Sequence, residues 1–252
     1  MVKPNREKAI AFLKSSEIGD KEFVKKWISE NYTSHYPSIK TGREALLELY
    51  DQLKDMDIKL EIKRIIEDGN YVALHSGYTG PMVVIDIFRF DDGKIVDHWA
   101  NTQNSVEETV SGHTMLDGST QIKDLDKTAE NKALLKELVE DVFIGGDYDK
   151  MSSFFDDDNY IQHNPRFADG LSGLVKGLEE MAKKGMEMKF IKNYMILGEG
   201  NFVLSVNEGF YNGEHVSFFD IFRIENSKFV EHWDVIEPIV PSEKWKNQNG
   251  KF

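Results

Sequence analysis

Near the end of the chain, a histidine and an aspartate stand two residues apart in the segment EHWDVIE. Side chains alternate between the faces of a strand, so His232 and Asp234 should project from one face. Inside an apolar pocket, desolvation raises the pKa of a carboxyl group toward neutrality and makes it a better general base. We therefore predict Asp234 as a catalytic base. His232 would tune it or hydrogen-bond a developing enolate oxygen. The alternative is that both bond within the sheet or face solvent.

Two further residues of this region are candidates for the same site. Asp220 opens the segment DIFRIE and shares its face with Phe222 and Ile224, so its carboxylate is either buried and hydrogen-bonded or part of the pocket. His163 lies in YIQHNP and is a candidate donor or orienting group. His163 could equally anchor its loop to a backbone carbonyl, and we favour that structural role because lone histidines usually have one.

The segments that carry these residues occur twice in the sequence. DIFR begins at Asp86 and again at Asp220, 134 residues apart, and each copy runs on to a His-Trp pair. NYTSHYP begins at Asn31 and NYIQHNP at Asn159, 128 residues apart. Because the matching blocks keep one order, the pattern indicates a tandem duplication of a whole domain with its own core.

The first copy keeps imidazoles but differs at the proposed base. His98 aligns with His232, whereas Ala100 stands in place of Asp234. We predict a substrate pocket with a degenerate catalytic site in this copy, with the candidate residues His35, His75, Asp86 and His98. Strand spacing does not make these side chains converge, so we predict no metal site. The sequence places the chemistry in the second half.

In each copy the sequence predicts helices followed by strands. Helices are predicted over 5–14, 42–55, 128–143 and 173–184, with a short second helix in each copy after a Gly-Asp stop. Strand candidates cover 58–65, 71–78, 81–90 and 94–103, and in the second copy 186–192, 201–211, 215–224 and 228–237. This order predicts an α+β fold in which three helices pack on a meandering antiparallel sheet.

The polar stretch between the copies sets the expected domain boundaries. We predict a first domain over 1–110, a linker over 111–127 and a second domain over 128–252. The aromatic residues Trp245 and Phe252 in the tail would anchor it to the body.

The Y..H.P segment and the terminal DIFR…GKIV.HWD hairpin resemble the SnoaL-like polyketide cyclase branch of the nuclear transport factor 2-like superfamily. The resemblance covers both copies and implies a cone-shaped fold with a pocket between helix and curved sheet. It also implies cofactor-free acid–base chemistry on a hydrophobic carbonyl compound, such as an aldol-type cyclisation or an isomerisation, with a carboxylate as base. Members of the superfamily often dimerise, which suggests an internal pseudo-dimer or a homodimer.

Three other functions stay open at this stage. One is a non-catalytic module that binds a small apolar ligand, and another is an interaction scaffold. An activity like that of limonene epoxide hydrolases would need an Asp-Arg-Asp set on one face of the sheet. Arg223 lies three residues after Asp220 in the same strand, so alternation places their side chains on opposite faces, and Arg223 would not join Asp220 and Asp234. Ketosteroid isomerases carry an acidic base before a similar proline, where this chain has Asn164 and Tyr36.

The composition of the chain disfavours several classes of binding partner. The formal net charge of −13 disfavours binding to nucleic acids or anionic membranes. The chain has no cysteine, which excludes disulfides, zinc–thiolate sites and a thiol nucleophile. No signal peptide or membrane span is evident, so we expect a cytoplasmic protein with a small hydrophobic ligand or substrate.

Overall fold

The computed structural model describes residues 4–53 and 56–252, which divide into two compact units. The first unit comprises Met1–Gln103 and Ile239–Phe252, and the second comprises Asn104–Pro238. The predicted boundaries therefore need two corrections. Residues 104–127 belong to the second unit, and the tail from Ile239 belongs to the first. The tail packs there because its side chains bond to backbone carbonyl groups near Tyr36.

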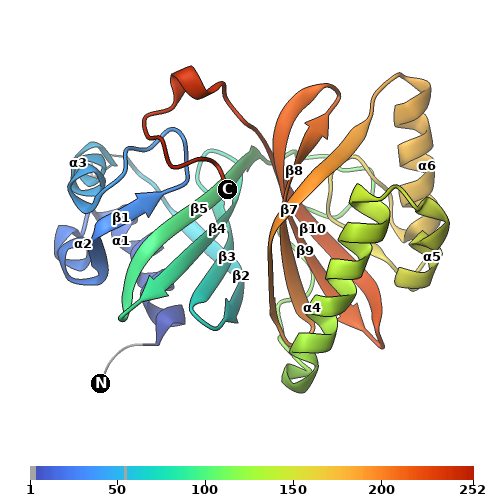
Figure 1. The fold of residues 1–252 in the computed structure, drawn as a ribbon, viewed down its shortest axis with the longest axis horizontal. Coiled ribbons are helices and arrows are strands. Elements are labelled where there is room, and N and C mark those ends of the chain that lie inside the picture. The colour runs from blue at the N-terminus through green and yellow to red at the C-terminus, as the bar shows by residue number, and fades with distance from the viewer. Residues whose placement is uncertain (1–3, 54–55) are drawn as a thin grey trace. The chain divides into compact units, whose positions relative to one another are not determined.

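The first unit is an α+β domain with helices on one face of a sheet (Figure 1). Its elements are α1 (Asn5–Ile18), α2 (Lys21–Trp27), β1 (Ile28–Ser34), α3 (Arg43–Leu53), β2 (Leu60–Asp68), β3 (Tyr71–Tyr78), β4 (Met82–Asp91) and β5 (Lys94–Asn104), with a 3₁₀ turn over Ser242–Lys244 in the tail. The five strands take the order β1-β5-β4-β3-β2. Apolar residues of the helices and of the inner sheet face form one core, which includes Phe12, Leu46 and Phe88.

The second unit repeats this topology. Its elements are α4 (Thr128–Glu137), a π-helical continuation over Leu138–Ile144, α5 (Met151–Phe154), β6 (Ile161–Gln162), α6 (Gly170–Lys183), β7 (Met188–Glu199), β8 (Phe202–Tyr211), β9 (Glu214–Glu225) and β10 (Lys228–Pro238), with 3₁₀ turns over Leu125–Lys127 and Tyr148–Lys150. The strand order is β6-β10-β9-β8-β7. The predicted α+β class, the tandem copies and the strand positions are confirmed.

The sheets are mixed, whereas the sequence predicted purely antiparallel ones. The NY..H.P segment of each copy contributes an extra edge strand that runs parallel to the last strand of the hairpin. In the second unit this pairing sets Gln162 beside His232, and in the first it sets Ser34 beside His98. Because neighbours in register share a face, the edge strand delivers residues directly to the site.

A β-bulge interrupts the alternation at the start of β10. Phe229 pairs with Ile224 and Glu231 pairs with Arg223, so Val230 is the extra residue. Strict alternation would place Phe229 on the outer face with Glu231. The bulge turns Phe229 into the core, where its ring lies 5.0 Å from that of Phe222.

The tail gives a first prediction about stability. Asn247 is buried, and its side-chain amide donates to the backbone oxygens of Tyr36 and Ile39 at 3.0 and 2.7 Å. The substitution Asn247→Ala leaves both carbonyl groups without this donor, so we expect the first unit to lose about 1–3 kcal/mol of stability. Hydrogen exchange measured by mass spectrometry should show the loss in peptides of the first unit.

Peptides of the second unit should keep their protection in this variant. The exposed tail residue Lys244, replaced by alanine, is the matched control and should change neither unit. Equal loss of protection in both units would contradict the assignment of the tail to the first.

Candidate active site

The inner face of the β9–β10 hairpin brings two carboxylates and an imidazole together. Asp220 lies directly opposite Asp234 in the antiparallel register, and His232 lies opposite Phe222. All three side chains are buried, and each offers a ligand or proton-binding atom within 4.8 Å of the others. The sequence prediction that His232 and Asp234 share a face therefore agrees with the structure, and Asp220 joins them.

These residues line an apolar cavity of about 80 Å³. Helices and the inner sheet face supply its other walls, which are Phe143, Tyr148, Met151, Phe155, Tyr160, Gln162, Phe167, Leu174, Leu178, Met188, Phe190 and Phe222. A larger hollow of about 570 Å³ shares Tyr148, Met151, Leu178 and Met188 with this cavity. The polar groups thus sit at one end of a mostly apolar space.

One oxygen of Asp234 is held and the other is not. Asn164 donates its side-chain amide to Oδ2 at 2.5 Å, whereas the buried Oδ1 accepts no hydrogen bond from the described residues. Burial raises the pKa of Asp234 above its ordinary value. The charge of His232 and the hydrogen bond from Asn164 oppose this rise, and the charge of Asp220 adds to it. The result is a desolvated carboxylate with an unused lone pair.

The contacts of His232 constrain where its hydrogen atoms lie. Gln162 Oε1 accepts from the backbone N–H of Asn164 at 2.9 Å, so this atom is the amide oxygen. The same oxygen lies 2.8 Å from His232 Nδ1, which must therefore carry hydrogen. His232 Nε2 then faces Asp220 Oδ1 at 3.3 Å, and this contact is a hydrogen bond only if the pair shares a second proton.

Asp220, His232 and Asp234 are also the residues that could hold a metal ion, within the part of the chain that the structure describes. Carboxylates and imidazole are suitable ligands for Zn²⁺. A shared proton satisfies the contact between His232 and Asp220 equally well. A shared proton and a metal ion are therefore alternative ways to satisfy this contact.

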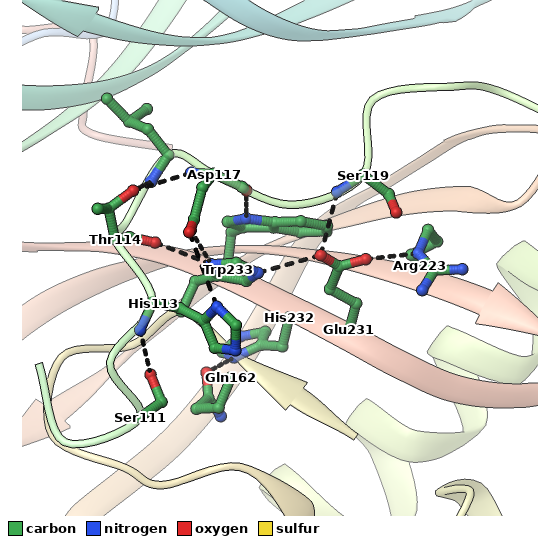
Figure 2. A network of polar contacts seen from close by, with 12 residues as sticks. Ser111, His113, Thr114, Asp117, Ser119, Gln162, Arg223, Glu231, His232 and Trp233 are labelled. Carbon is green, nitrogen blue, oxygen red and sulfur yellow. Dashed lines mark hydrogen bonds and ion pairs between the residues drawn. The ribbon is translucent and has the colours of Figure 1, made fainter. Parts of the chain in front are cut away.

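The structure gives His163 the anchoring role that the sequence analysis favoured, and not the catalytic one. Its ring lies on the outer face of the sheet, stacked on Trp233 with centroids 4.7 Å apart. Figure 2 labels its partners Trp233, Thr114 and Glu231. Its Nδ1 contacts Thr114 O and Asp117 Oδ1, both at 2.8 Å, and its Nε2 contacts Glu231 Oε1 at 3.1 Å. His163 therefore anchors the segment over 111–119 to the sheet, and it does not line the pocket.

Glu231 is the centre of this outer network. It accepts from Arg223 Nε at 2.6 Å and from the backbone N–H of Ser119 at 3.1 Å. Burial alone would raise the pKa of Glu231, but the hydrogen bonds from His163 and Arg223 lower it to about 2. Gly118, with a φ of +87°, fits only as glycine, since an added Cβ would lie 2.1 Å from Glu231 Oε1.

The first unit has the same outer network. His35 stacks on Trp99 with centroids 4.4 Å apart and lies 3.5 Å from Asp97, which accepts from Arg89 at 2.7 Å. His75 also lies outside the pocket, with Nδ1 3.2 Å from Arg64. His35 and His75 were predicted as pocket residues and are not brought there. Asp86 and His98 do line a cavity, with His98 Nε2 2.8 Å from Asp86 Oδ1.

Gln162 and Asn164 are site residues that the sequence analysis missed. Their aligned residues in the first copy are Ser34 and Tyr36, so they change together with the exchange of Asp234 for Ala100. Alternation along YIQHNP could have found them. Read as a strand, the segment puts Gln162 and Asn164 on one face and His163 on the other.

The two α+β units repeat one topology, with helices over a five-stranded mixed sheet, which is consistent with two nuclear transport factor 2-like domains in tandem. Residues 10–98 match the family model of the SnoaL-like domain. This match lies within the first unit, and the second unit has the same topology. None of the curated protein sequences matches the chain.

Solved structures of this class are similar to part of the chain. The candidate polyketide cyclase IdmH from Streptomyces antibioticus is 19% identical, with 40% of this chain and 93% of that chain covered and a TM-score of 0.36. An LEH-like epoxide hydrolase from M. tuberculosis is 21% identical, with 39% and 82% covered and a TM-score of 0.34. A candidate ketosteroid isomerase from Kribbella flavida DSM 17836 is 18% identical, with 47% and 91% covered and a TM-score of 0.37. At these scores the likeness carries no inference about activity.

Among the helices of the described residues, none has the length and apolar character that a membrane span requires.

The outer network predicts how acid affects the second unit. Because the pKa of Glu231 is lowered to about 2, its ionised form stabilises the fold above the usual value of 4.5, and this contribution is lost as the pH falls from 4.5 toward 2. Glu231→Gln should cost about 3 kcal/mol at pH 7, since it removes the buried carboxylate that pairs with Arg223 and His163 and leaves Arg223 only the exposed Glu225. Urea denaturation across this pH range measures both effects.

The matched control is Glu225→Gln. Glu225 also pairs with Arg223 but is exposed, so we expect this change to cost at most about 1 kcal/mol. Equal effects of the two substitutions would contradict the assignment of Glu231 as the centre of the network.

Proposed function

We propose that the second unit is a cofactor-free acid–base enzyme that removes a proton from carbon next to a carbonyl group of an apolar small molecule. Asp234 is the base. The observation that carries this proposal is that Asp234 lines the cavity and that its buried Oδ1 accepts no hydrogen bond from the described residues. Its raised pKa makes it a stronger base than an ordinary aspartate.

The pair of His232 and Asp220 supplies the complementary acid. When Asp234 takes the C–H proton, the electron pair of that bond moves onto the carbonyl oxygen and forms an enolate. The proton shared by His232 and Asp220 lies in the same cluster and can pass to the developing oxyanion. In an isomerisation, Asp234 returns its proton to another carbon of a conjugated enol while the enol oxygen gives its proton back to the pair of His232 and Asp220. In an aldol addition, the enol carbon attacks a second carbonyl group, the enol oxygen gives its proton back to the pair, and the new alkoxide takes the proton from Asp234.

The walls of the cavity support an apolar substrate. Aromatic and aliphatic side chains surround the three polar residues, and the adjoining hollow lined by Met181, Met186 and Met188 can take a longer apolar body. A non-catalytic binding module would use the same walls, so the decisive question is whether Asp234 moves a proton.

Hydrogen–deuterium exchange of a ketone answers this question without knowledge of the natural substrate. We expect the protein in D₂O to speed the incorporation of deuterium at the acidic carbon of 2-tetralone, measured by NMR. Asp234→Asn should lower the protein-dependent rate by about 10²- to 10⁴-fold, because the amide cannot accept the proton.

The exposed carboxylate of Asp156, replaced by Asn in the same unit, is the matched control and should leave the rate unchanged. Treatment with EDTA should also leave it unchanged, whereas loss of activity on chelation would point to a metal mechanism at the same residues. Full activity of Asp234→Asn would overturn the proposal, and no exchange by the intact protein would favour the binding module.

The pH dependence of exchange tests the role of Asn164. Its hydrogen bond to Oδ2 lowers the pKa of Asp234, so Asn164→Ala should raise that pKa further. Since the base works only when ionised, the acidic limb of the rate profile should move to higher pH in the variant. The exposed Asn159, replaced by alanine, should leave the limb in place. A limb at the same pH in both variants would show that Asn164 does not tune the base.

A further inference from the structure

The first unit contains a cavity of about 530 Å³ between its helices and its sheet. Described residues from α1, α3, β3 and β4 form most of its walls, and they are mainly apolar, including Phe12, Leu13, Leu46, Leu49 and Tyr50. The cavity lies wholly within the first unit. Its volume suits a small molecule with an apolar body.

Polar groups meet at one part of this wall. His98 contacts Tyr32 Oη through Nδ1 at 2.9 Å and Asp86 Oδ1 through Nε2 at 2.8 Å. Burial raises the pKa of Tyr32 well above its usual value, so this hydroxyl stays protonated and can donate. A neutral His98 then satisfies both contacts, since it accepts from Tyr32 at Nδ1 and donates to Asp86 from Nε2.

This arrangement leaves one buried acceptor unused. Asp86 is 4% exposed, and its Oδ2 accepts no hydrogen bond from the described residues. Burial raises the pKa of Tyr78 in the same wall, and the charge of Asp86 and a side-chain interaction of the Tyr78 hydroxyl with that carboxylate add to the rise. The hydroxyl does not reach hydrogen-bond geometry with Oδ2, so this oxygen keeps no donor among the described residues. A buried carboxylate oxygen without a donor is costly, so a ligand that donates to it gains a charge-assisted hydrogen bond.

The comparison with the second unit favours binding over proton abstraction here. Ala100 replaces the base Asp234, and its supporting partner Asn164 is replaced by Tyr36. The remaining carboxylate, Asp86, already accepts from His98, whose contacts need no additional proton. This site therefore lacks the acid–base pair of the second unit but keeps an acceptor that faces an apolar space.

We propose that the first unit is a separate binding site for an apolar alcohol or phenol, whose hydroxyl group donates to Asp86 Oδ2. This proposal does not depend on the activity of the second unit. It assigns the two halves different tasks, with ligand binding in the first and proton transfer in the second.

Isothermal titration calorimetry with three naphthalene probes tests the proposal on the full chain. We expect 2-naphthol to bind about tenfold more tightly than naphthalene, which corresponds to one hydrogen bond of about 1.4 kcal/mol. The anion 2-naphthoate should bind more weakly than both, because its charge repels Asp86. Asp86→Asn should remove the preference for 2-naphthol over naphthalene.

Two cavity-filling variants locate the site even if Asp86→Asn fails to fold. Leu49→Trp fills the first cavity and should abolish binding of 2-naphthol, whereas Leu178→Trp fills the cavity of the second unit and should leave it unchanged. Circular dichroism checks that both variants are folded.

Three results would overturn the proposal. The first is equal affinity for 2-naphthol and naphthalene in the intact protein. The second is loss of binding in Leu178→Trp but not in Leu49→Trp. The third is tighter binding of the cation 1-naphthylmethylammonium than of 2-naphthol, which would make Asp86 a site for amines. Deuterium exchange on 2-tetralone depends on Asp234, so failure of either proposal is distinguishable from failure of the other.

Discussion

The register of β9 against β10 is the constraint on which the site depends. It sets Asp220 directly opposite Asp234 on a buried face, where two like charges repel each other and neither is well solvated. His232 contacts Asp220 at 3.3 Å and opposes the rise in the pKa of Asp234 with its charge. Burial is the main cause of that rise, and the charge of Asp220 adds to it, so the same pairing that costs stability also makes Asp234 harder to ionise.

The opposite face of the same strand provides the rigidity that such a cluster needs. Glu231 and Trp233 alternate with His232 and Asp234, and they fasten β10 to β9 and to the segment over 111–119 (Figure 2). A buried ion pair with satisfied partners fixes geometry even where it adds little net stability. The outer face thus determines where the inner side chains point.

The two units share the residues of the outer sheet face and differ in the residues of the inner face. Both keep a histidine stacked on a tryptophan, next to an acid that pairs with an arginine, on the outer face. On the inner face both keep an Asp-His pair, but only the second unit has Asp234 with Asn164 and Gln162 beside it. The two units therefore share the same outer-face contacts, whereas their pockets differ in volume and in the polar side chains that line them.

The sequence by itself determined what local periodicity encodes. Alternation placed His232 and Asp234 on one face of their strand and placed Asp220 on the same face as Phe222 and Ile224. It also located the strands to within a few residues. The internal repeat showed that the fold occurs twice. Resemblance in the same segments indicated the SnoaL-like family, which the match over 10–98 supports.

Only the tertiary structure decided which segments become neighbours. The parallel pairing of β6 with β10 brings Gln162 to His232 and turns His163 to the outer face, and the bulge at Val230 turns Phe229 into the core. The return of the tail to the first unit is likewise a long-range contact. Such pairings depend on the packing of distant residues, which local side-chain spacing does not specify. For the same reason, the sequence could single out Asp234 but not Asn164, which holds one of its oxygens and leaves the other without a hydrogen bond from the described residues.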